Sequence, residues 1–290
     1  MKKAHITPPL KTSRFRWGLF LGAALSTIAA SNLVAGVLVA PTVIFMSDKS
    51  RTGRMDIQNP TNIPKEVTIR FSYGLPISDT AGNVYITLQD SGVVDPRSAV
   101  EWIKAFPRKV VIPPNGTQVV RLVATPPKGL ADGEYWARIV VRTQEGETSI
   151  PAPAEEGTIS TKLNMIMQTA IMVKYRTGNL TSKIELASAE AYRNDTSVVV
   201  IVDLSNKGNV SYVGMLSCRL LDMNKKELGR QQTDLAVYRD LKRRMELPLQ
   251  NVTASGPYQV EVSITTDGRS DIAPEDLIPG NKVTYSMAVE

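Results

Sequence analysis

Residues 158–176, TISTKLNMIMQTAIMVKYR, contain no proline and no glycine and make a segment longer than an ordinary strand. Read with a period of two, the side chains of Ile159, Leu163, Met165 and Met167 fall on one face. A long strand with an apolar face invites pairing, and native proteins usually block such an edge. Two interpretations follow: the apolar face belongs to the chain's own core, or the strand accepts a strand of another polypeptide by β-augmentation.

The N-terminus has the pattern of a secretory signal. Five Lys and Arg residues precede an apolar segment at 17–30, and small residues follow. The sequence predicts a signal at residues 1–31, with cleavage after Ser31 or as late as Ala35. The alternative is an uncleaved anchor, because the low-polarity stretch 17–40 is long enough to span a bilayer.

The charge and the reactive side chains exclude several classes of function. Residues 1–31 hold five Lys and Arg and no acid, so the formal charge of +6 falls to about +1 once they are removed. No basic tract with interleaved aromatics remains, which argues against nucleic-acid binding. The only histidine, His5, lies in the signal, so the mature chain has no histidine base and no histidine for a zinc site.

A single cysteine, Cys218, excludes an internal disulfide and a cysteine metal cluster. It lies in the apolar stretch VGMLSCRLL, which indicates a small buried side chain; an intermolecular disulfide is the alternative. No carboxylates form a recognisable acid–base pair, so a hydrolase of the glycosidase type is the least favoured class of function. We therefore predict a protein that is not an enzyme and has no cofactor and no metal.

The remaining residues form two blocks of short β segments separated by Pro, Gly and Asn turns, typical of two all-β, immunoglobulin-like sandwich domains. The predicted domains are residues 36–176 and 177–290.

Two segments carry other signals besides those of the strands. The segment 98–106 has the spacing of a short helix or turn, and the basic run 242–244 is interpreted as a solvated face. Strands are expected at 37–45, 54–58, 66–73, 83–89, 108–112, 117–124, 134–142 and 158–176, then at 196–204, 210–221, 233–238, 243–247, 258–265 and 282–289.

Several motifs of the first block resemble those of the periplasmic chaperones that assemble pili and fimbriae in Gram-negative bacteria. They are VIF at 43–45, MDIQNP at 55–60, PPNGTQVVRL at 113–122, QT at 168–169 and YR at 175–176. The resemblance covers most of residues 36–177. It implies two immunoglobulin-like domains set at an angle, in a boomerang, with a cleft between them.

The resemblance also implies a function for the opening segment. A pilus or fimbria subunit lacks its last strand, and such a chaperone lends one of its own, a form of β-augmentation called donor-strand complementation. Leu163, Met165 and Met167 would fill the groove of the subunit, and an outer-membrane usher would receive the complex. Methionine suits grooves of differing shape because its side chain is flexible. In the free protein, a second copy could cover the exposed strand instead.

The chain departs from the family pattern at the cationic anchor. Members carry an arginine before VIF and a lysine four residues before the junction arginine, and together these grip the terminal carboxylate of the subunit. Here the two positions hold Thr42 and Met172, which cannot make charge-assisted contacts. Lys174, on the same strand face as Met172, either takes over part of this role or is an ordinary solvated lysine.

The junction arginine itself is present as Arg176. In the family it forms an ion pair between the domains, and the candidate partners here are Asp132 and Glu134. Such a pair would set the angle between the domains and contribute little net stability. Two functions from different classes follow: a non-enzymatic periplasmic chaperone, or a secreted two-domain structural or adhesion protein that holds no subunit. A chaperone should leave the face of Leu163, Met165 and Met167 accessible, whereas a structural protein should cover it.

Overall fold

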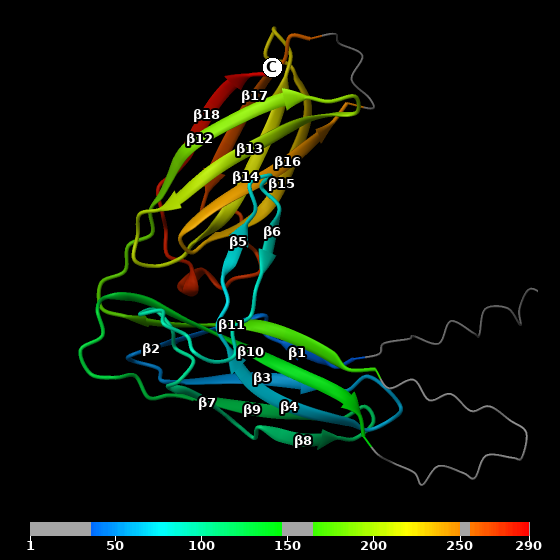
Figure 1. Cartoon of the computed structure of the whole chain (residues 1–290), viewed down its shortest axis with the longest axis vertical. Helices are drawn as coiled ribbons and strands as arrows, with labels where there is room; N and C mark the ends of the chain where they lie inside the picture. Colours follow the sequence, from blue (N-terminus) through cyan, green and yellow to red (C-terminus); the bar gives the residue numbers. More distant parts are fainter. Residues whose placement is uncertain (1–35, 147–164, 250–255, 290) are drawn as a thin grey trace, which may run out of the picture. The chain divides into compact units, whose positions relative to one another are not determined.

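The computed structural model describes residues 36–146, 165–249 and 256–289, and almost all of its regular structure is β-strand (Figure 1). The strands of the described residues form two β-sandwiches, each with its own buried apolar core. The prediction of an all-β chain with two immunoglobulin-like sandwiches is confirmed. A single 3₁₀ turn, η1 (Pro274–Asp276), is the helical element of these residues. None of the described helices has the length and apolar character needed to cross a membrane.

The first sandwich is built from two sheets. One has the strand order β1-β3-β9-β7 and the other the order β2-β11-β10-β4-β8. Their inner faces enclose a core that includes Ile57, Leu122, Ile139 and Tyr175, all fully buried. The strands are β1 (Leu38–Ala40), β2 (Val43–Ser47), β3 (Thr52–Gln58), β4 (Lys65–Ser72), β7 (Ile103–Phe106), β8 (Lys109–Ile112), β9 (Thr117–Ala124), β10 (Gly133–Glu145) and β11 (Met167–Thr177).

The second sandwich has sheets of order β12-β13-β16 and β15-β14-β17-β18. Its core includes Cys218, which is fully buried and free, and burial raises the pKa of its thiol to about 12. The prediction of a small buried side chain at this position is confirmed. The strands are β12 (Ile184–Arg193), β13 (Ser197–Asn206), β14 (Tyr212–Leu221), β15 (Glu227–Val237), β16 (Asp240–Pro248), β17 (Gln259–Thr265) and β18 (Val283–Ala288).

The predicted first strand at 37–45 is wrong as a single element. Pro41 separates β1, which pairs with β3 in one sheet, from β2, which pairs with β11 in the other. Proline has no N–H to give to a ladder, so the chain changes sheets there. The segment 98–106 is not a helix: turns lead into β7, because every second side chain, Ile103 and Ala105, is buried in the core. The strand β12 was not predicted, because its alternation of small and polar residues is weak.

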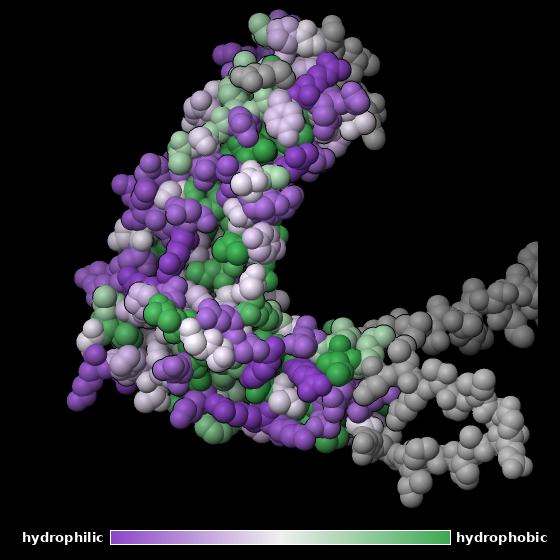
Figure 2. Space-filling model, viewed as in Figure 1, coloured by the Kyte–Doolittle hydropathy of each residue, from purple (hydrophilic) through white to green (hydrophobic). Residues whose placement is uncertain are grey.

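A short hairpin leaves the first sandwich between β4 and β7. It consists of β5 (Pro76–Ser78) and β6 (Val84–Ile86), which pair antiparallel (Figure 1). Figure 2 shows that hydrophobic side chains lie in small groups among hydrophilic ones on the viewed face. The hairpin supplies exposed apolar side chains, including Ile77, Tyr85 and Ile86.

An asparagine side chain organises a turn in each sandwich, from a fully buried position at Asn59 and a partly buried one at Asn206. The Asn59 Nδ2 group donates to the carbonyl oxygens of Ile63 at 2.8 Å and of Ile112 and Pro113 at 3.1 Å, and its Oδ1 accepts from Thr61. In the second sandwich, Asn206 Nδ2 donates to three backbone carbonyls in the same way. Each amide satisfies backbone groups that would otherwise be buried without a partner.

The Asn59→Ala variant should therefore lower the free energy of unfolding by about 1–3 kcal/mol, because it leaves buried carbonyl oxygens unpaired. Urea denaturation followed by tryptophan fluorescence measures this difference. Asn224→Ala, at an exposed position in the turn between β14 and β15, is the control and should unfold at nearly the wild-type midpoint. Equal midpoints for all three proteins would show that the amide of Asn59 contributes nothing.

Candidate functional site

The edge of β11 is only partly covered among the described residues. β10 pairs with β11 along its whole length, from Met167 to Thr177. On the other side, β2 pairs in parallel only with the second half, from Met172 to Arg176. We call the uncovered side of residues 167–171 the open edge. It is open because the chain before Pro41 runs in the other sheet as β1, so that β2 covers β11 only from Met172 onward.

The register shows which backbone groups the open edge presents. The Met172 N–H donates to the Thr42 carbonyl at 3.3 Å, on the side of β2. Because backbone groups alternate along a strand, the N–H groups of Gln168 and Ala170 point to that same side. Both residues are exposed. The open edge therefore offers donors and acceptors with the spacing of a β-ladder.

The apolar side chains predicted to act at this strand lie at its beginning. Met165 is 47% exposed and Met167 is 37% exposed, with the Met167 side chain close to Gly36. Leu163 lies outside the described residues. Sequence reasoning missed Ile166, which is 46% exposed, because it falls on the opposite face of the period-two pattern. Hydrophobic surface is visible in Figure 2 near the grey atoms, at the end of β10 and β11.

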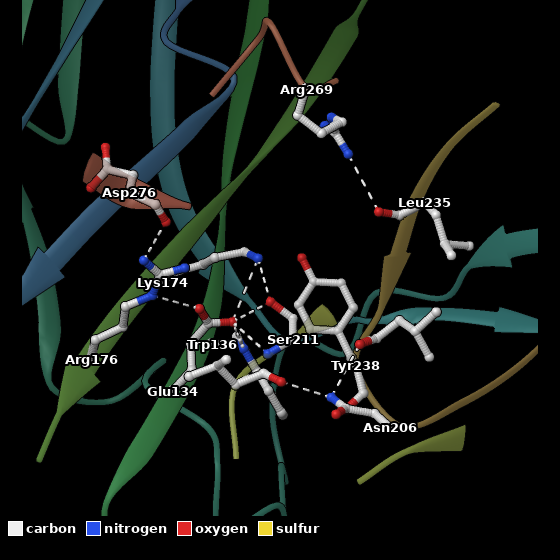
Figure 3. Close-up of polar contacts among 12 residues, drawn as sticks. Glu134, Trp136, Lys174, Arg176, Asn206, Ser211, Leu235, Tyr238, Arg269 and Asp276 are labelled. Carbon is white, nitrogen blue, oxygen red and sulfur yellow. Dashed lines mark hydrogen bonds and ion pairs between the residues drawn. The ribbon is translucent and has the colours of Figure 1, made fainter. Parts of the chain in front are cut away.

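Beyond the open edge, β10 and β11 carry a group of buried charges on their outer face. Glu134 is fully buried and lies opposite Arg176 in the strand register. Its Oε2 accepts from Arg176 Nε at 2.8 Å, and its Oε1 accepts from Ser211 Oγ at 2.5 Å. Lys174 Nζ lies 3.5 Å from the same Oε1 (Figure 3). We call Glu134, Lys174, Arg176 and Ser211 the buried charge cluster.

The cluster connects the two sandwiches. The Glu134–Arg176 pair joins two neighbouring strands of the first sandwich, so it is not itself a pair between domains. The second sandwich contributes Ser211, just before β14, and the carbonyl of Asp276 in η1, which accepts from Arg176 Nη1 at 2.5 Å (Figure 3). Sequence reasoning missed both groups, because a serine and a backbone carbonyl carry no signal in a sequence.

Lys174 is not solvated: it is 2% exposed. Its Nζ donates to Ser211 Oγ at 2.5 Å and lies 4.9 Å from the centre of the Tyr238 ring. Tyr238 in turn packs edge-to-face against Trp136, whose Nε1 donates to Glu134 at 2.7 Å. The interpretation of Lys174 as an ordinary solvated lysine is wrong, since every donor contact of its ammonium lies inside the protein.

The other positions of the expected anchor hold no cation. Thr42 is exposed and uses its carbonyl to accept from Met172. Met172 is buried in a small apolar cluster with Tyr73, Trp136 and Tyr238. Asp132, the alternative partner of Arg176, instead accepts from the backbone and side chain of Asn179 at 3.0 and 3.2 Å. Among the described residues, no cluster of His, Cys, Asp and Glu could hold a metal ion.

The charges of the cluster decide the ionisation of Glu134. Burial, the largest single influence, raises the pKa of this carboxyl, but the charges of Lys174 and Arg176 and the hydrogen bonds from Ser211 and Trp136 outweigh it. The pKa of Glu134 is therefore lower than its ordinary value of 4.5, and the carboxylate stays ionised at neutral pH.

Comparisons with known proteins find similarity at the level of structure. No family model and no curated protein matches the chain. The chain is similar to the CsuC–CsuE chaperone–tip adhesion subunit complex of Acinetobacter baumannii, at 11% identity and a TM-score of 0.44, covering 88% of this chain and 99% of that one. It is also similar to the Pseudomonas aeruginosa CupB2 chaperone, at 12% identity and a TM-score of 0.42, covering 87% and 100%.

A third similar structure is the Salmonella enterica SafA pilin in complex with the SafB chaperone, at 13% identity and a TM-score of 0.39, covering 87% and 96%. Each of the three structures contains a chaperone. At these identities and TM-scores, the likeness says nothing about what this chain binds.

The Glu134→Gln variant should be strongly destabilised at pH 7. It leaves two buried cations without a counter-charge, and breaking a buried ion pair in this way costs about 3–5 kcal/mol. Chemical denaturation measures the loss. Glu227→Gln is the matched control, because Glu227 pairs with Arg230 on an exposed surface and should change stability little. Equal losses in the two variants would contradict the assigned role of Glu134.

The stability difference between wild type and Glu134→Gln should also depend on pH. Because the folded-state pKa of Glu134 is lowered, its stabilising effect is complete above about pH 4.5 and is lost as the pH falls through the folded-state value. The difference in unfolding free energy between wild type and Glu134→Gln should therefore stay constant from pH 7 to 5 and shrink below that. A difference that grows on acidification would show that Glu134 is protonated in the folded protein.

Proposed function

We propose that this protein is a periplasmic chaperone that binds subunits of a pilus or fimbria by donor-strand complementation. It stabilises each subunit and delivers it to an outer-membrane usher for assembly. The protein acts without a cofactor and without catalysis. The proposal rests on the open edge of β11, together with the sequence motifs of the first sandwich.

The open edge supports this function because it meets the requirements of strand addition. Its outward N–H and C=O groups, at Gln168 and Ala170, can extend the ladder to an incoming strand. Met165, two residues before this strand, and Met167, its first residue, are exposed, although a stable sheet normally protects its apolar face. We assign Leu163, Met165 and Met167 as the side chains that enter the subunit groove.

The buried charge cluster supports a different anchoring from that of the resembled family. Lys174 is already held by Ser211 and Glu134, and Thr42 and Met172 carry no charge. A subunit would then be held by main-chain hydrogen bonds and apolar contacts instead of by a cationic grip on its terminal carboxylate. Each ladder hydrogen bond contributes about 1 kcal/mol, so several pairs are needed for stable binding.

Residues 1–31 are a secretion signal that directs the chain to the periplasm. Cleavage follows Ser31 or lies as late as Ala35. The chaperone-type domain spans residues 36–176 and the second immunoglobulin-like domain spans residues 177–290. The free protein is protected from aggregation by self-association through the exposed strand.

A periplasmic pull-down of the tagged protein tests the proposal. Wild type should recover a small secreted β-rich protein, identified by mass spectrometry. The Met165→Glu/Met167→Glu variant should lose it, because charged side chains cannot enter an apolar groove. Met223→Glu is the matched control, since Met223 is 71% exposed in the turn after β14, and it should recover the same protein as wild type.

Ala170→Pro adds a test of the backbone. It removes one outward N–H of the open edge and leaves the N–H groups that face β10 in place. This variant should fold normally and recover at least tenfold less subunit. If wild type and all variants purify alone and equally folded, the donor-strand function is refuted, and a secreted structural or adhesion protein is the better assignment.

A further inference from the structure

The β5–β6 hairpin makes contacts that the proposed function does not use. It leaves the first sandwich after β4, and Tyr73 and Gln89 close its base through two backbone hydrogen bonds of 2.9 and 2.7 Å. The buried Arg138 of β10 donates from Nε to the Gly74 carbonyl at 2.7 Å. The base of the hairpin is therefore fixed to the first sandwich.

Hydrogen bonds within the turn hold the tip of the hairpin. The Asp79 carboxylate accepts from the backbone N–H groups of Ala81 and Asn83, both at 2.9 Å, and from the Asn83 side chain at 2.8 Å. These hydrogen bonds, with that of the Asn83 side chain foremost, lower the pKa of Asp79. Gly82 has φ of +80°, a conformation that favours glycine.

This tip contacts the second sandwich at β16. The Arg244 N–H donates to the Gly82 carbonyl at 3.0 Å, and the Lys242 N–H donates to Ser78 Oγ at 2.8 Å. Val84 of β6 packs against the core of the second sandwich. The hairpin of the first sandwich thus reaches the backbone of the second one.

The two N–H groups belong to the outer edge of a sheet. β16 is the last strand of its sheet and pairs with β13 on one side only. Lys242 and Arg244 are two residues apart, so both of their N–H groups point away from β13. An edge of this kind is open to unwanted pairing unless something covers it. The interpretation of residues 242–244 as a simple solvated face is therefore incomplete.

Gly82 is required for this contact on steric grounds as well. A Cβ atom at this position would lie 2.7 Å from the Arg244 backbone nitrogen, a distance that real Cβ contacts essentially never show. The hairpin tip can approach β16 this closely only because the side chain is absent. A positive φ and a close backbone contact thus coincide at one residue.

We propose that the β5–β6 hairpin is a brace, which ties the two sandwiches together and covers the outer edge of β16. It acts at a second place besides the buried charge cluster. With both attachments in place, the two sandwiches move as one body, whether or not the protein binds a subunit. The inference is independent of the proposed function.

Gly82→Ala tests the brace, and Gly129→Ala is its matched control. Gly129 has φ of +75° and no atom within 4 Å of an added Cβ, so both variants place alanine at a positive φ but only one breaks the contact. Amide hydrogen exchange, measured by NMR on the mature chain, should rise at least tenfold at Lys242 and Arg244 in Gly82→Ala. Exchange at Arg243 and Met245, whose N–H groups face β13, should not change.

Residual dipolar couplings of the same samples report whether the sandwiches move together. Wild type and Gly129→Ala should fit one alignment tensor, and Gly82→Ala should need a separate tensor for each sandwich. Unchanged exchange at Lys242 and Arg244 in Gly82→Ala would overturn the proposal. Faster exchange with a single tensor would also overturn the brace, because the hairpin would then only cover the edge.

Discussion

The buried charges on the outer face of β10 and β11 depend on one group, the carboxylate of Glu134. A fully buried carboxylate is stable only when hydrogen bonds and opposite charges replace the water that it has lost. Arg176 and Lys174 from the neighbouring strand provide the charges, and Ser211 from the second sandwich provides a hydrogen bond. Because these partners come from both sandwiches, one buried charge connects the strand pair to the second sandwich.

This arrangement separates two tasks along a single strand. The second half of β11 is paired on both sides and carries the buried charges, so it is held firmly. The first half, at residues 167–171, is paired only with β10. The rigid half can position the open edge without covering it. A cation that is already neutralised within the protein, as Lys174 is, cannot at the same time bind a carboxylate from outside.

The β5–β6 hairpin covers a second sheet edge, that of β16, whereas the described residues leave the edge of β11 open at residues 167–171. β16 has outward N–H groups, as β11 has, but here the chain itself satisfies two of them through Gly82 and Ser78. The same chain therefore covers one sheet edge with its own residues and leaves the edge of β11 uncovered in the part that the structure describes. In this chain, a hydrogen-bonded turn and a glycine cover the edge of β16, and no equivalent hairpin lies against residues 167–171 among the described residues.

The sequence by itself determined the class of fold and most of the strands. Alternating side chains and Pro, Gly and Asn turns act locally, so β9 was predicted to the residue, and the burial of Cys218 followed from its apolar neighbours. The same signals failed where local and tertiary effects compete, as at Pro41, where one expected strand became two strands in different sheets.

Only the tertiary structure decided the state of Lys174, the choice of Glu134 over Asp132 as the partner of Arg176, and the contact of Gly82 with β16. Each depends on groups more than 30 residues away, including a serine hydroxyl and backbone atoms. Such groups are present throughout any chain and acquire a role only when folding brings them together.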